Sequence, residues 1–518
     1  MSQKKYVYVV SLIVALGGFL MGFDASVISG VNRFIELEFE LTKIQLGWAV
    51  ASLTLSATLA MMIAGPLSDR LGRKKVLSLA AILYSISAIG SAFAPSFLIL
   101  VIARMIGGLG VGASLIVAPM YIAEIAPTKI RGSLVSINQL NIVLGISVAF
   151  FTNYMILQLG QSDLAWAQAL QFDTYNWRWM LGLETLPAIF YFIGLFFVPN
   201  SPRWLMMKER DDEAMDVFTK VNGKEKAGEV YKLVKNSFEK EKDEEKRTLR
   251  DLFKPALKLV LLVGIVIGVL QQITGINAVF FYAPIIFEQT GIGTDASFVQ
   301  AILVGLTNLV FTVLAILFID RLGRKPLLIG GVGGIALCML VLSFAFSSAT
   351  YSLQQESITE LPAEINQQQL SPMIGVVYDN DLSFKQALSA NLGDDVAAAY
   401  ESQLITAAAD INATLILICI LGFVASFAIS LGPIMWVLFS EIFPNYIRGL
   451  AISFVGLINS AVSFGVQLVF PWELANFGSS ITFLIYGVFA VAGLIFIITV
   501  VPETKGKSLE ELEIYLAK

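Results

Sequence analysis

Long apolar stretches alternate with short polar segments along almost the whole chain. Windows of roughly 20 residues, the length that a helix needs to cross a bilayer, fall near residues 7–29, 47–67, 76–95, 98–123, 133–157 and 178–199. Six more fall near residues 257–288, 297–319, 326–348, 411–439, 449–471 and 478–501. This pattern predicts an all-α membrane protein with twelve transmembrane helices, six in each half. An even number of spans places both termini on one side.

Two polar segments interrupt the pattern. Residues 200–256 are rich in Lys and Glu and are expected to form short amphipathic helices that join the halves. Residues 349–410 are rich in Gln, Ser and Asp; a helix over Ala397–Asp410 is one option, and the sequence leaves open whether this loop folds. We therefore expect an N-terminal six-helix bundle (1–199), a helical linker (200–256) and a C-terminal six-helix bundle (257–518).

The two halves repeat the same short turns. The run Gly65–Lys75, GPLSDRLGRKK, has a close copy at Phe318–Lys325, FIDRLGRK. The pair Glu124 and Arg131-Gly132 is matched by Glu441 and Arg448-Gly449. Such internal repetition predicts two pseudosymmetric bundles, the usual architecture of a secondary transporter.

Charge asymmetry between alternate loops predicts the orientation. The turns at 69–75 and 320–325 and the segment 200–256 carry most of the basic residues. In contrast, residues 349–410 hold Lys385 alone against nine acids. The positive-inside rule therefore places both termini and the basic turns in the cytoplasm, and residues 349–410 outside, in a multi-pass protein of the cytoplasmic membrane.

Composition narrows the class of function. The chain is 56% hydrophobic and 14% charged, with a mean hydropathy of +0.75, so lipid is its expected solvent. The two cysteines lie in apolar stretches, so neither a disulfide framework nor a metal site is expected. The basic residues are scattered over short turns, so no nucleic-acid surface is expected. No cofactor is expected. The chain contains no histidine, so any proton that it carries must be held by a carboxylate.

Few charged residues fall inside the predicted spans, where an uncompensated charge is costly. Asp24 lies in the first span, Arg104 in the fourth and Glu184 in the sixth. Arg104 is the expected partner of Asp24: its charge would favour the carboxylate, whereas burial would favour the neutral acid. A carboxyl group whose pKa is subject to these opposing effects can change its protonation during the transport cycle, which coupling to protons requires. A permanent structural ion pair is the alternative.

The seventh predicted span contains three amides, Gln271, Gln272 and Asn277. Carboxamides both donate and accept hydrogen bonds, as sugar hydroxyls require. In an ideal helix Gln272 and Asn277 would point about 140° apart, but Gly275 and Pro284 predict a break that lets both line one site. Amides that merely hold helices together are the alternative.

Further polar residues extend this set. The tenth span contains Gly432-Pro433 followed by Trp436, whose indole offers a flat apolar face and one N–H donor; a core or interfacial anchor is the alternative. Amides also fall in the fifth, eighth and eleventh spans, namely Asn138, Gln139, Asn308 and Asn459. Several amides in different spans, with very few charges, predict a neutral polyhydroxylated substrate.

Acids and bases at the cytoplasmic helix ends predict a gate. The acids are Asp69, Glu124, Asp320 and Glu441, and the bases are Arg73, Arg131, Arg324 and Arg448. Because they occur at matching positions in both halves, they could pair across the cleft when its inner mouth is shut. Charges that only set the topology are the alternative, and we prefer that interpretation for Lys74, Lys75 and Lys325.

Together these motifs resemble the sugar porter family of the major facilitator superfamily, and most of all its bacterial sugar–proton symporters. The resemblance rests on GFD at 22–24, both DRLGRK turns, RMIGG at 104–108, PMYIAE at 119–124, SPRWL at 201–205, the Gln271-Gln272 pair and PETKG at 502–506. It implies that Asp24 couples protons with Arg104 and Glu184. It also implies sugar contacts at Gln139, Gln271, Gln272, Asn277, Asn308, Trp436 and Asn459.

The resemblance does not name the sugar, because Met21, Asn459 and Ser460 differ from residues common in the family. Facilitative relatives carry asparagine at the Asp24 position, so its presence here favours symport. A uniporter in which Asp24 and Arg104 never separate, and a non-transporting sugar receptor, remain alternatives; an enzyme is not expected. We expect the chain to act as a monomer in the bilayer, with a monosaccharide and a proton as its partners.

Overall fold

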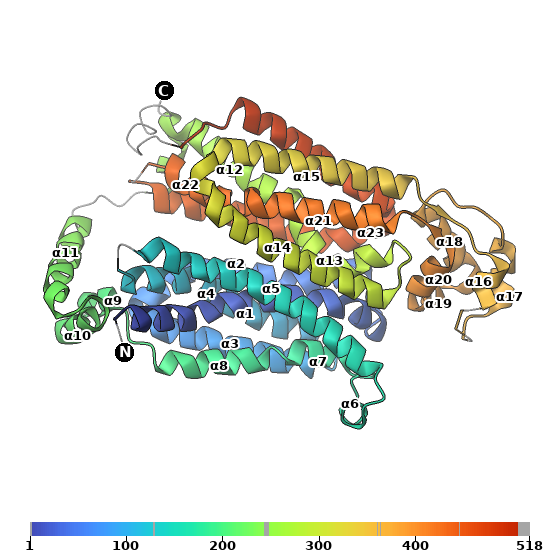
Figure 1. The fold of residues 1–518 in the computed structure, drawn as a ribbon, viewed down its shortest axis with the longest axis horizontal. Coiled ribbons are helices and arrows are strands. Elements are labelled where there is room, and N and C mark those ends of the chain that lie inside the picture. Colours follow the sequence, from blue (N-terminus) through green and yellow to red (C-terminus); the bar gives the residue numbers. More distant parts are fainter. Residues whose placement is uncertain are drawn as a thin grey trace. The chain divides into compact units, whose positions relative to one another are not determined.

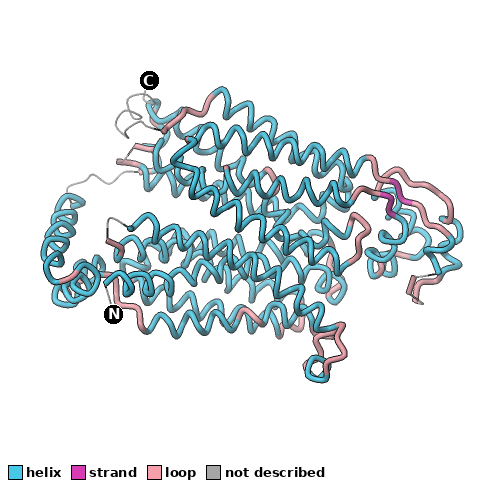
Figure 2. Tube along the Cα trace, viewed as in Figure 1, coloured by secondary structure: helices cyan, strands magenta, loops and turns pink. Residues whose placement is uncertain are grey.

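The computed structural model describes residues 3–127, 130–242, 248–359, 361–362, 364–444 and 446–505, without the side chains of 237–242, 256 and 320. These residues are almost entirely helical (Figures 1 and 2). Helices of the first half are α1 (Gln3–Glu38), α2 (Lys43–Leu71), α3 (Arg73–Ala92), α4 (Phe97–Ile125), α5 (Arg131–Gly160), α6 (Ala165–Ala169), α7 (Asn176–Gly182) and α8 (Thr185–Phe196).

The polar segment that joins the halves also folds into helices. They are α9 (Pro202–Met207), α10 (Asp211–Asn222) and α11 (Lys224–Lys242), followed by 3₁₀ turns at Leu249–Phe253 and Pro255–Leu257. α10 begins with three acids, Asp211, Asp212 and Glu213, and ends with Lys220, which suits the helix dipole.

The second half contains the remaining helices and one small sheet. Its long helices are α12 (Lys258–Ile273), α13 (Ile276–Glu288), α14 (Thr294–Leu322), α15 (Arg324–Ser347), α21 (Ala413–Ile429), α22 (Leu431–Ile442) and α23 (Arg448–Thr499). Between α15 and α21 lie β1 (Thr350–Tyr351), α16 (Gln355–Thr359), α17 (Gln367–Leu370), a 3₁₀ turn (Ser371–Met373), α18 (Asp381–Leu392), α19 (Asp394–Ala399), α20 (Glu401–Ala408) and β2 (Ala409–Asp410).

Among the described residues, eleven helical segments are long and apolar enough to cross a membrane. The difference from the twelve expected spans arises in α23, which is 52 residues long. At 1.5 Å per residue it would extend about 78 Å, more than twice the thickness of a hydrocarbon core. However, Gly478 has non-helical backbone angles (φ 74°, ψ 170°), so α23 holds the two expected spans, 449–471 and 478–501, without a loop between them.

The repeated turn has the same backbone in both halves. α2 and α3 are separated by Gly72 (φ 98°), and α14 and α15 by Gly323 (φ 95°). A side chain at such positive φ is strained. The glycine in each DRLGRK motif therefore allows one long helix to reverse directly into the next.

The described chain divides into two compact units. Unit 1 comprises Met1–Val27, Ser52–Ala149 and Arg178–Thr248, and unit 2 comprises Ile28–Ala51, Phe150–Trp177 and Leu249–Lys518. The ends of α1 and α2 on either side of residue 40 therefore pack with unit 2. Within unit 2, α15 packs against α21 and α23, and α12 packs against α23.

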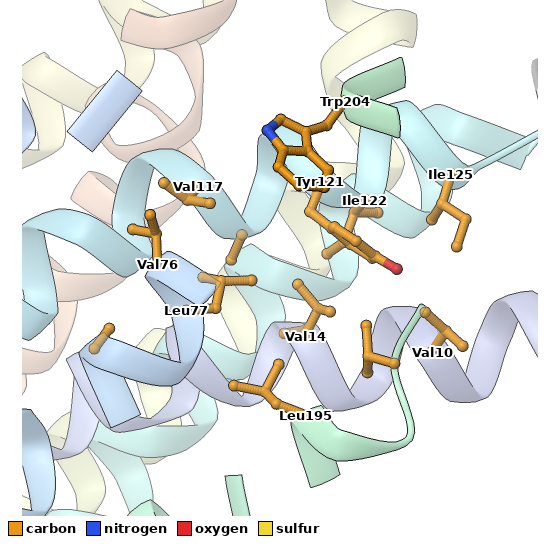
Figure 3. Close-up of a cluster of buried hydrophobic side chains, with 14 of the residues drawn as sticks. Val10, Val14, Val76, Leu77, Val117, Tyr121, Ile122, Ile125, Leu195 and Trp204 are labelled. Atoms are coloured by element: carbon orange, nitrogen blue, oxygen red, sulfur yellow. The ribbon is translucent and has the colours of Figure 1, made fainter. Parts of the chain in front are cut away.

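Unit 1 is built on an apolar core where α1, α3, α4, α8 and α9 meet (Figure 3). Figure 3 shows the Trp204 indole from α9 beside Tyr121 and Ile122 of α4, close to the start of the linker. Trp204 also donates its indole N–H to the Asp69 carbonyl at 3.1 Å. The first linker helix is therefore an integral part of this unit.

Residues 349–410, which we call the loop subdomain, have a hydrophobic core of their own. β1 and β2 pair antiparallel, Thr350 with Asp410 and Tyr351 with Ala409, so the two ends of the segment are closed together. Tyr351 stacks on Phe384 with ring centroids 5.4 Å apart. The question that the sequence left open is thus answered: most of this loop is folded. The optional helix over Ala397–Asp410 appears as α20, preceded by the separate α19 and followed by β2.

Candidate functional site

The charged residues predicted inside the first, fourth and sixth spans come together in unit 1. Asp24 lies on α1, Arg104 on α4, and Glu184 in the turn between α7 and α8. Their exposed fractions are 2%, 1% and 2%, so each charge must be compensated within the protein. We call these three residues the Asp24 pocket.

The contact between Asp24 and Arg104 is single and long. Arg104 Nη1 lies 3.4 Å from Asp24 Oδ1, whereas a strong charge-assisted hydrogen bond measures about 2.8 Å. Asp24 Oδ2 and Glu184 Oε1 are buried and make no hydrogen bond in the described structure. Either oxygen can therefore accept a proton without breaking an existing bond, which is the chemistry that a coupling carboxylate needs.

A glycine of α4 makes room for this pocket. A Cβ atom on Gly107 would lie 2.8 Å from Asp24 Oδ2, closer than such atoms approach without displacement. The small residue at this position in the RMIGG motif therefore lets the aspartate sit directly against the helix backbone.

The predicted amides of the second half form a connected network in unit 2. We use the name amide cluster for Gln271, Gln272, Asn277, Asn459 and Ser463. Asn277 donates from Nδ2 to Gln272 Oε1 and to Ser463 Oγ, both at 2.7 Å. Asn459 donates from Nδ2 to Gln271 Oε1 at 2.9 Å, and Gln272 Nε2 donates to Asn459 Oδ1 at 3.3 Å. The cluster contains no charged group.

The expected helix break creates this geometry. α12 ends at Ile273, Gly275 takes a left-handed conformation (φ 89°), and α13 starts at Ile276. A second irregularity follows at Tyr282 (φ −126°, ψ 17°), two residues before Pro284. The break brings Gln272 and Asn277 together, because their side chains are hydrogen-bonded to each other.

The break in the tenth span lies earlier than expected. The non-helical residue is Ser430 (φ −124°, ψ −96°), and Gly432 and Pro433 belong to the first turn of α22. Proline is well tolerated in a first helical turn because its missing N–H would have no partner there. Gln271 Nε2 donates to the carbonyl of Leu431, the first residue of α22, at 3.0 Å, so the amide cluster is in contact with this second break.

The other predicted sugar-contacting residues are spread over both units. Asn308 is buried on α14 and Trp436 is 47% exposed on α22. Trp436 packs edge-on against Phe439 with centroids 6.0 Å apart, which leaves much of the indole face uncovered. Gln139 is exposed on α5 in unit 1.

The basic turn of unit 1 is held by one buried arginine. Arg73 Nη2 lies 2.9 Å from Glu124 Oε1, and Arg73 Nη1 lies 2.9 Å from Asp69 Oδ1. Ser201 donates from Oγ to Glu124 Oε2. Arg73, Asp69, Glu124 and Ser201 form what we call the N-terminal arginine cluster.

The equivalent C-terminal arginine cluster lies in unit 2. Arg324 Nη2 contacts Glu441 Oε1 at 2.8 Å, and Thr504 donates from Oγ1 to Glu441 Oε2 at 2.6 Å. Glu503 accepts from the backbone N–H groups of Arg324 and Lys325 at 3.2 and 3.1 Å. The internal repeat thus extends to a hydroxyl that follows the last span of each half, Ser201 in one and Thr504 in the other.

These pairings lie within single units: the partners of Arg73 and Arg324 named above belong to the same unit as the arginine. Pairing across the cleft when its inner mouth is shut stays a prediction. Arg131 is exposed, and Arg448 donates from Nε to the Phe443 carbonyl at 3.0 Å. The side chain of Asp320 lies outside the described part of the structure.

Sequence reasoning overlooked several members of these sites. Ser463 and Gln467 follow Asn459 at intervals of four on α23, and Gln467 Nε2 donates to Ser463 Oγ at 2.8 Å. This helical spacing of polar residues in an apolar span was the available signal. Ser201 and Thr504 carried no comparable signal, because their partners are more than 60 residues away.

Comparison with known proteins agrees with this geometry. The family described as "Sugar (and other) transporter" matches residues 10–360 and 392–516. The chain is 34% identical to the arabinose-proton symporter of Bacillus subtilis, over 98% of this chain and 94% of that protein. It is also 34% identical to the D-xylose-proton symporter of Escherichia coli K12, over 99% of this chain and 96% of that protein.

A solved structure supports the same assignment. The xylose transporter XylE from E. coli, in an inward open conformation, aligns with a TM-score of 0.74 and 32% identity, over 98% of this chain and 100% of that one. Eleven long apolar helical segments among the described residues, two repeated arginine clusters and a family match over residues 10–360 and 392–516 lead to one conclusion. The chain is a multi-pass membrane protein of the sugar transporter family.

Proposed function

We propose that the protein is a secondary active transporter that carries a monosaccharide across the cytoplasmic membrane by alternating access, together with a proton. The observation that carries the proposal is the uncharged amide cluster in unit 2, combined with a separate buried carboxylate pocket in unit 1. The first suits a neutral polyhydroxylated ligand and the second suits a proton. The similarity to an arabinose-proton symporter and a D-xylose-proton symporter supports both assignments.

We assign sugar binding to the amide cluster and its neighbours. Both recorded hydrogen bonds of Asn277 use its N–H groups, which leaves its carbonyl available to accept from a sugar hydroxyl. The uncovered face of Trp436 can stack on the apolar face of a sugar ring. We assign Gln139, Gln271, Gln272, Asn277, Asn308, Trp436 and Asn459 to the sugar site.

We assign proton coupling to the Asp24 pocket. When Asp24 is ionised, Arg104 holds it; when Asp24 is protonated, Arg104 is released to other partners, and Glu184 lies within electrostatic reach of both. Protonation therefore changes which contacts α1 and α4 can make. A change of this kind can bias the equilibrium between two transporter conformations, and sugar must bias it through contacts that also differ between them.

We infer the orientation from the basic turns. The positive-inside rule places both arginine clusters and both termini in the cytoplasm and the loop subdomain outside. The arginine clusters then brace the cytoplasmic ends of α2–α4 and of α14, α15 and α22. We propose that they stabilise one conformation of the inner mouth. We further propose bundles at 1–199 and 257–518, the linker at 200–256, and a monomer in the bilayer as the functional unit.

Exchange in proteoliposomes tests the proposal. Protein is reconstituted with unlabelled D-xylose, L-arabinose or D-glucose inside, and uptake of the same labelled sugar from outside is measured with no energy source. A carrier gives transient accumulation by counterflow, whereas a receptor gives none. Repeating the assay with an imposed pH difference separates a symporter from a uniporter, because only the symporter accumulates sugar against its gradient.

A further inference from the structure

Part of the loop subdomain lies outside the residues that the sugar transporter family matches. The family match stops at residue 360 and resumes at 392, although this stretch contributes buried side chains such as Leu370, Met373, Phe384 and Leu388 to the subdomain core. A folded segment without a counterpart in the family match is a place where this chain can differ from its relatives.

Beneath the loop subdomain, unit 2 contains a cavity of about 520 Å³. Its walls come from the adjoining ends of α1 and α2, from α13, from the middle of α23 and from α18–α20. Cavities between about 300 and 1,000 Å³ are typical of small-molecule sites. A monosaccharide with some bound water fits within this volume.

The subdomain is fastened over this cavity by polar contacts. Lys385 Nζ contacts Gln289 Oε1, just after α13, at 2.6 Å, and also contacts Glu401 Oε1 within the subdomain at 2.7 Å. Burial would raise the pKa of the Glu401 carboxyl, but the ammonium groups of Lys385 and Lys43 outweigh this and lower the pKa to about 2. Asp381 accepts from the backbone N–H of Ser479 on α23 at 2.9 Å. The roof is therefore held in place at neutral pH.

The three cations around the cavity are each paired with a carboxylate. Arg33 contacts Glu288 at 2.7 Å, Lys43 contacts Glu36, and Lys385 contacts Glu401. The lining contains these three cations and four acids, the fourth acid being Asp394. An anionic ligand would have to displace a carboxylate from its cation. A neutral ligand can instead use the remaining donors and acceptors, together with Gln386, Ser389 and Ser402.

An aromatic layer separates the cavity from the amide cluster. Tyr282 and Phe470 line the cavity and are themselves fully buried, with ring centroids 5.1 Å apart. Tyr282 donates from its hydroxyl to the Gln467 carbonyl at 2.8 Å, and the Gln467 amide donates to Ser463 of the cluster. The two compartments are thus adjacent but distinct.

We propose that this cavity is a second sugar site, which holds a neutral monosaccharide on the outer side of the Tyr282–Phe470 layer. The loop subdomain forms its roof, and the paired charges with Gln386, Ser389 and Ser402 supply its hydrogen bonds. The proposal rests on the transport function proposed above. It adds a site for the same class of substrate, formed in part by residues that have no counterpart in the family match.

Protection of an introduced thiol measures occupancy of this site directly. Gln386 is exposed and lines the cavity, whereas Ala390 is exposed on the same helix and does not line it. Gln386→Cys and Ala390→Cys are labelled in proteoliposomes with a membrane-impermeant maleimide, with the parent protein as background. The probe is whichever of D-xylose, L-arabinose and D-glucose exchanges fastest. Both variants are repeated in an Asn277→Ala background, or in Trp436→Ala if the first does not fold.

Sugar is expected to slow labelling of Gln386→Cys and to leave Ala390→Cys unchanged. At ten times the half-protecting concentration the rate should fall about tenfold, and protection should persist in the Asn277→Ala background, where sugar binding at the amide cluster is weakened. If protection vanishes in the Asn277→Ala background, the amide cluster alone binds sugar and the proposal is overturned. The proposal is also overturned if Gln386→Cys fails to react with the maleimide, or if sugar fails to protect it. Exchange by wild-type protein in the same vesicles reports separately on the transport function.

Discussion

Replacing Asn277 with alanine tests the amide cluster as the sugar site. The asparagine side chain makes two 2.7 Å hydrogen bonds, to Gln272 and to Ser463. Its loss removes one acceptor for a sugar hydroxyl and also the partner that orients Gln272. Each hydrogen bond is worth about 1 kcal/mol net, so the loss of two effects amounts to about 2 kcal/mol, or about a 30-fold weaker affinity for sugar.

Equilibrium exchange in proteoliposomes measures this effect as the sugar concentration that gives half-maximal exchange. Asn476→Ala is the matched control, because Asn476 is an exposed amide on α23 whose Nδ2 donates to the Trp472 carbonyl. The variant Asn277→Ala should raise the half-saturating concentration about 30-fold, and Asn476→Ala should leave it unchanged. Equal values for wild type and Asn277→Ala, with both proteins correctly folded by size-exclusion chromatography, would refute the assignment of the sugar site.

Three further predictions follow from the described contacts. Asp24→Asn should retain sugar exchange but lose accumulation driven by a pH difference; retained accumulation would remove Asp24 from the coupling mechanism. Gly478→Ala should lower thermal stability by about 2 kcal/mol, because residue 478 has φ 74° and its Cβ would lie 2.6 Å from Asp381 Oδ1. The control Gly465→Ala has open space around its Cβ and should leave the stability unchanged. Equal melting temperatures for the two variants would contradict this prediction. Because the pKa of Glu401 is lowered to about 2, its ionised form stabilises the fold above about pH 4.5, and this stabilisation is lost as the pH falls towards 2. Glu401→Gln should therefore reduce the loss of stability between these pH values. An unchanged dependence of stability on pH would contradict a stabilising role for the ionised Glu401.

Much of the fold could be predicted from local sequence. Twelve apolar windows located the membrane-length segments, the last two of which lie within α23, and the DRLGRK motifs were expected to form short turns between apolar segments. The break between Gln272 and Asn277 was expected from Gly275 and Pro284, and α12 does end before Gly275. These inferences succeed because helix length, glycine conformation and hydrophobic periodicity depend on neighbouring residues.

The remaining features depend on contacts between distant residues. Nothing near Glu124 in the chain identifies Ser201 as its partner, and nothing near Lys385 identifies Gln289. The polar composition of 349–410 obscured a small core formed by residues such as Tyr351 and Phe384, which lie far apart in that segment. The continuity of α23 was also hidden, because a helix and a loop are both compatible with the residues around Gly478.

Accumulation of sugar against its gradient, driven only by an imposed pH difference, tests the central claim most directly. Proteoliposomes containing the wild-type protein are diluted into buffer one pH unit more acidic than their interior, with labelled sugar outside. One pH unit corresponds to about 1.4 kcal/mol per proton, so a carrier that moves one proton with each sugar should concentrate the sugar about tenfold, and a protonophore should abolish this. If the internal concentration rises only to the external value, with exchange still active, the protein is a uniporter and the coupling role of Asp24 is wrong.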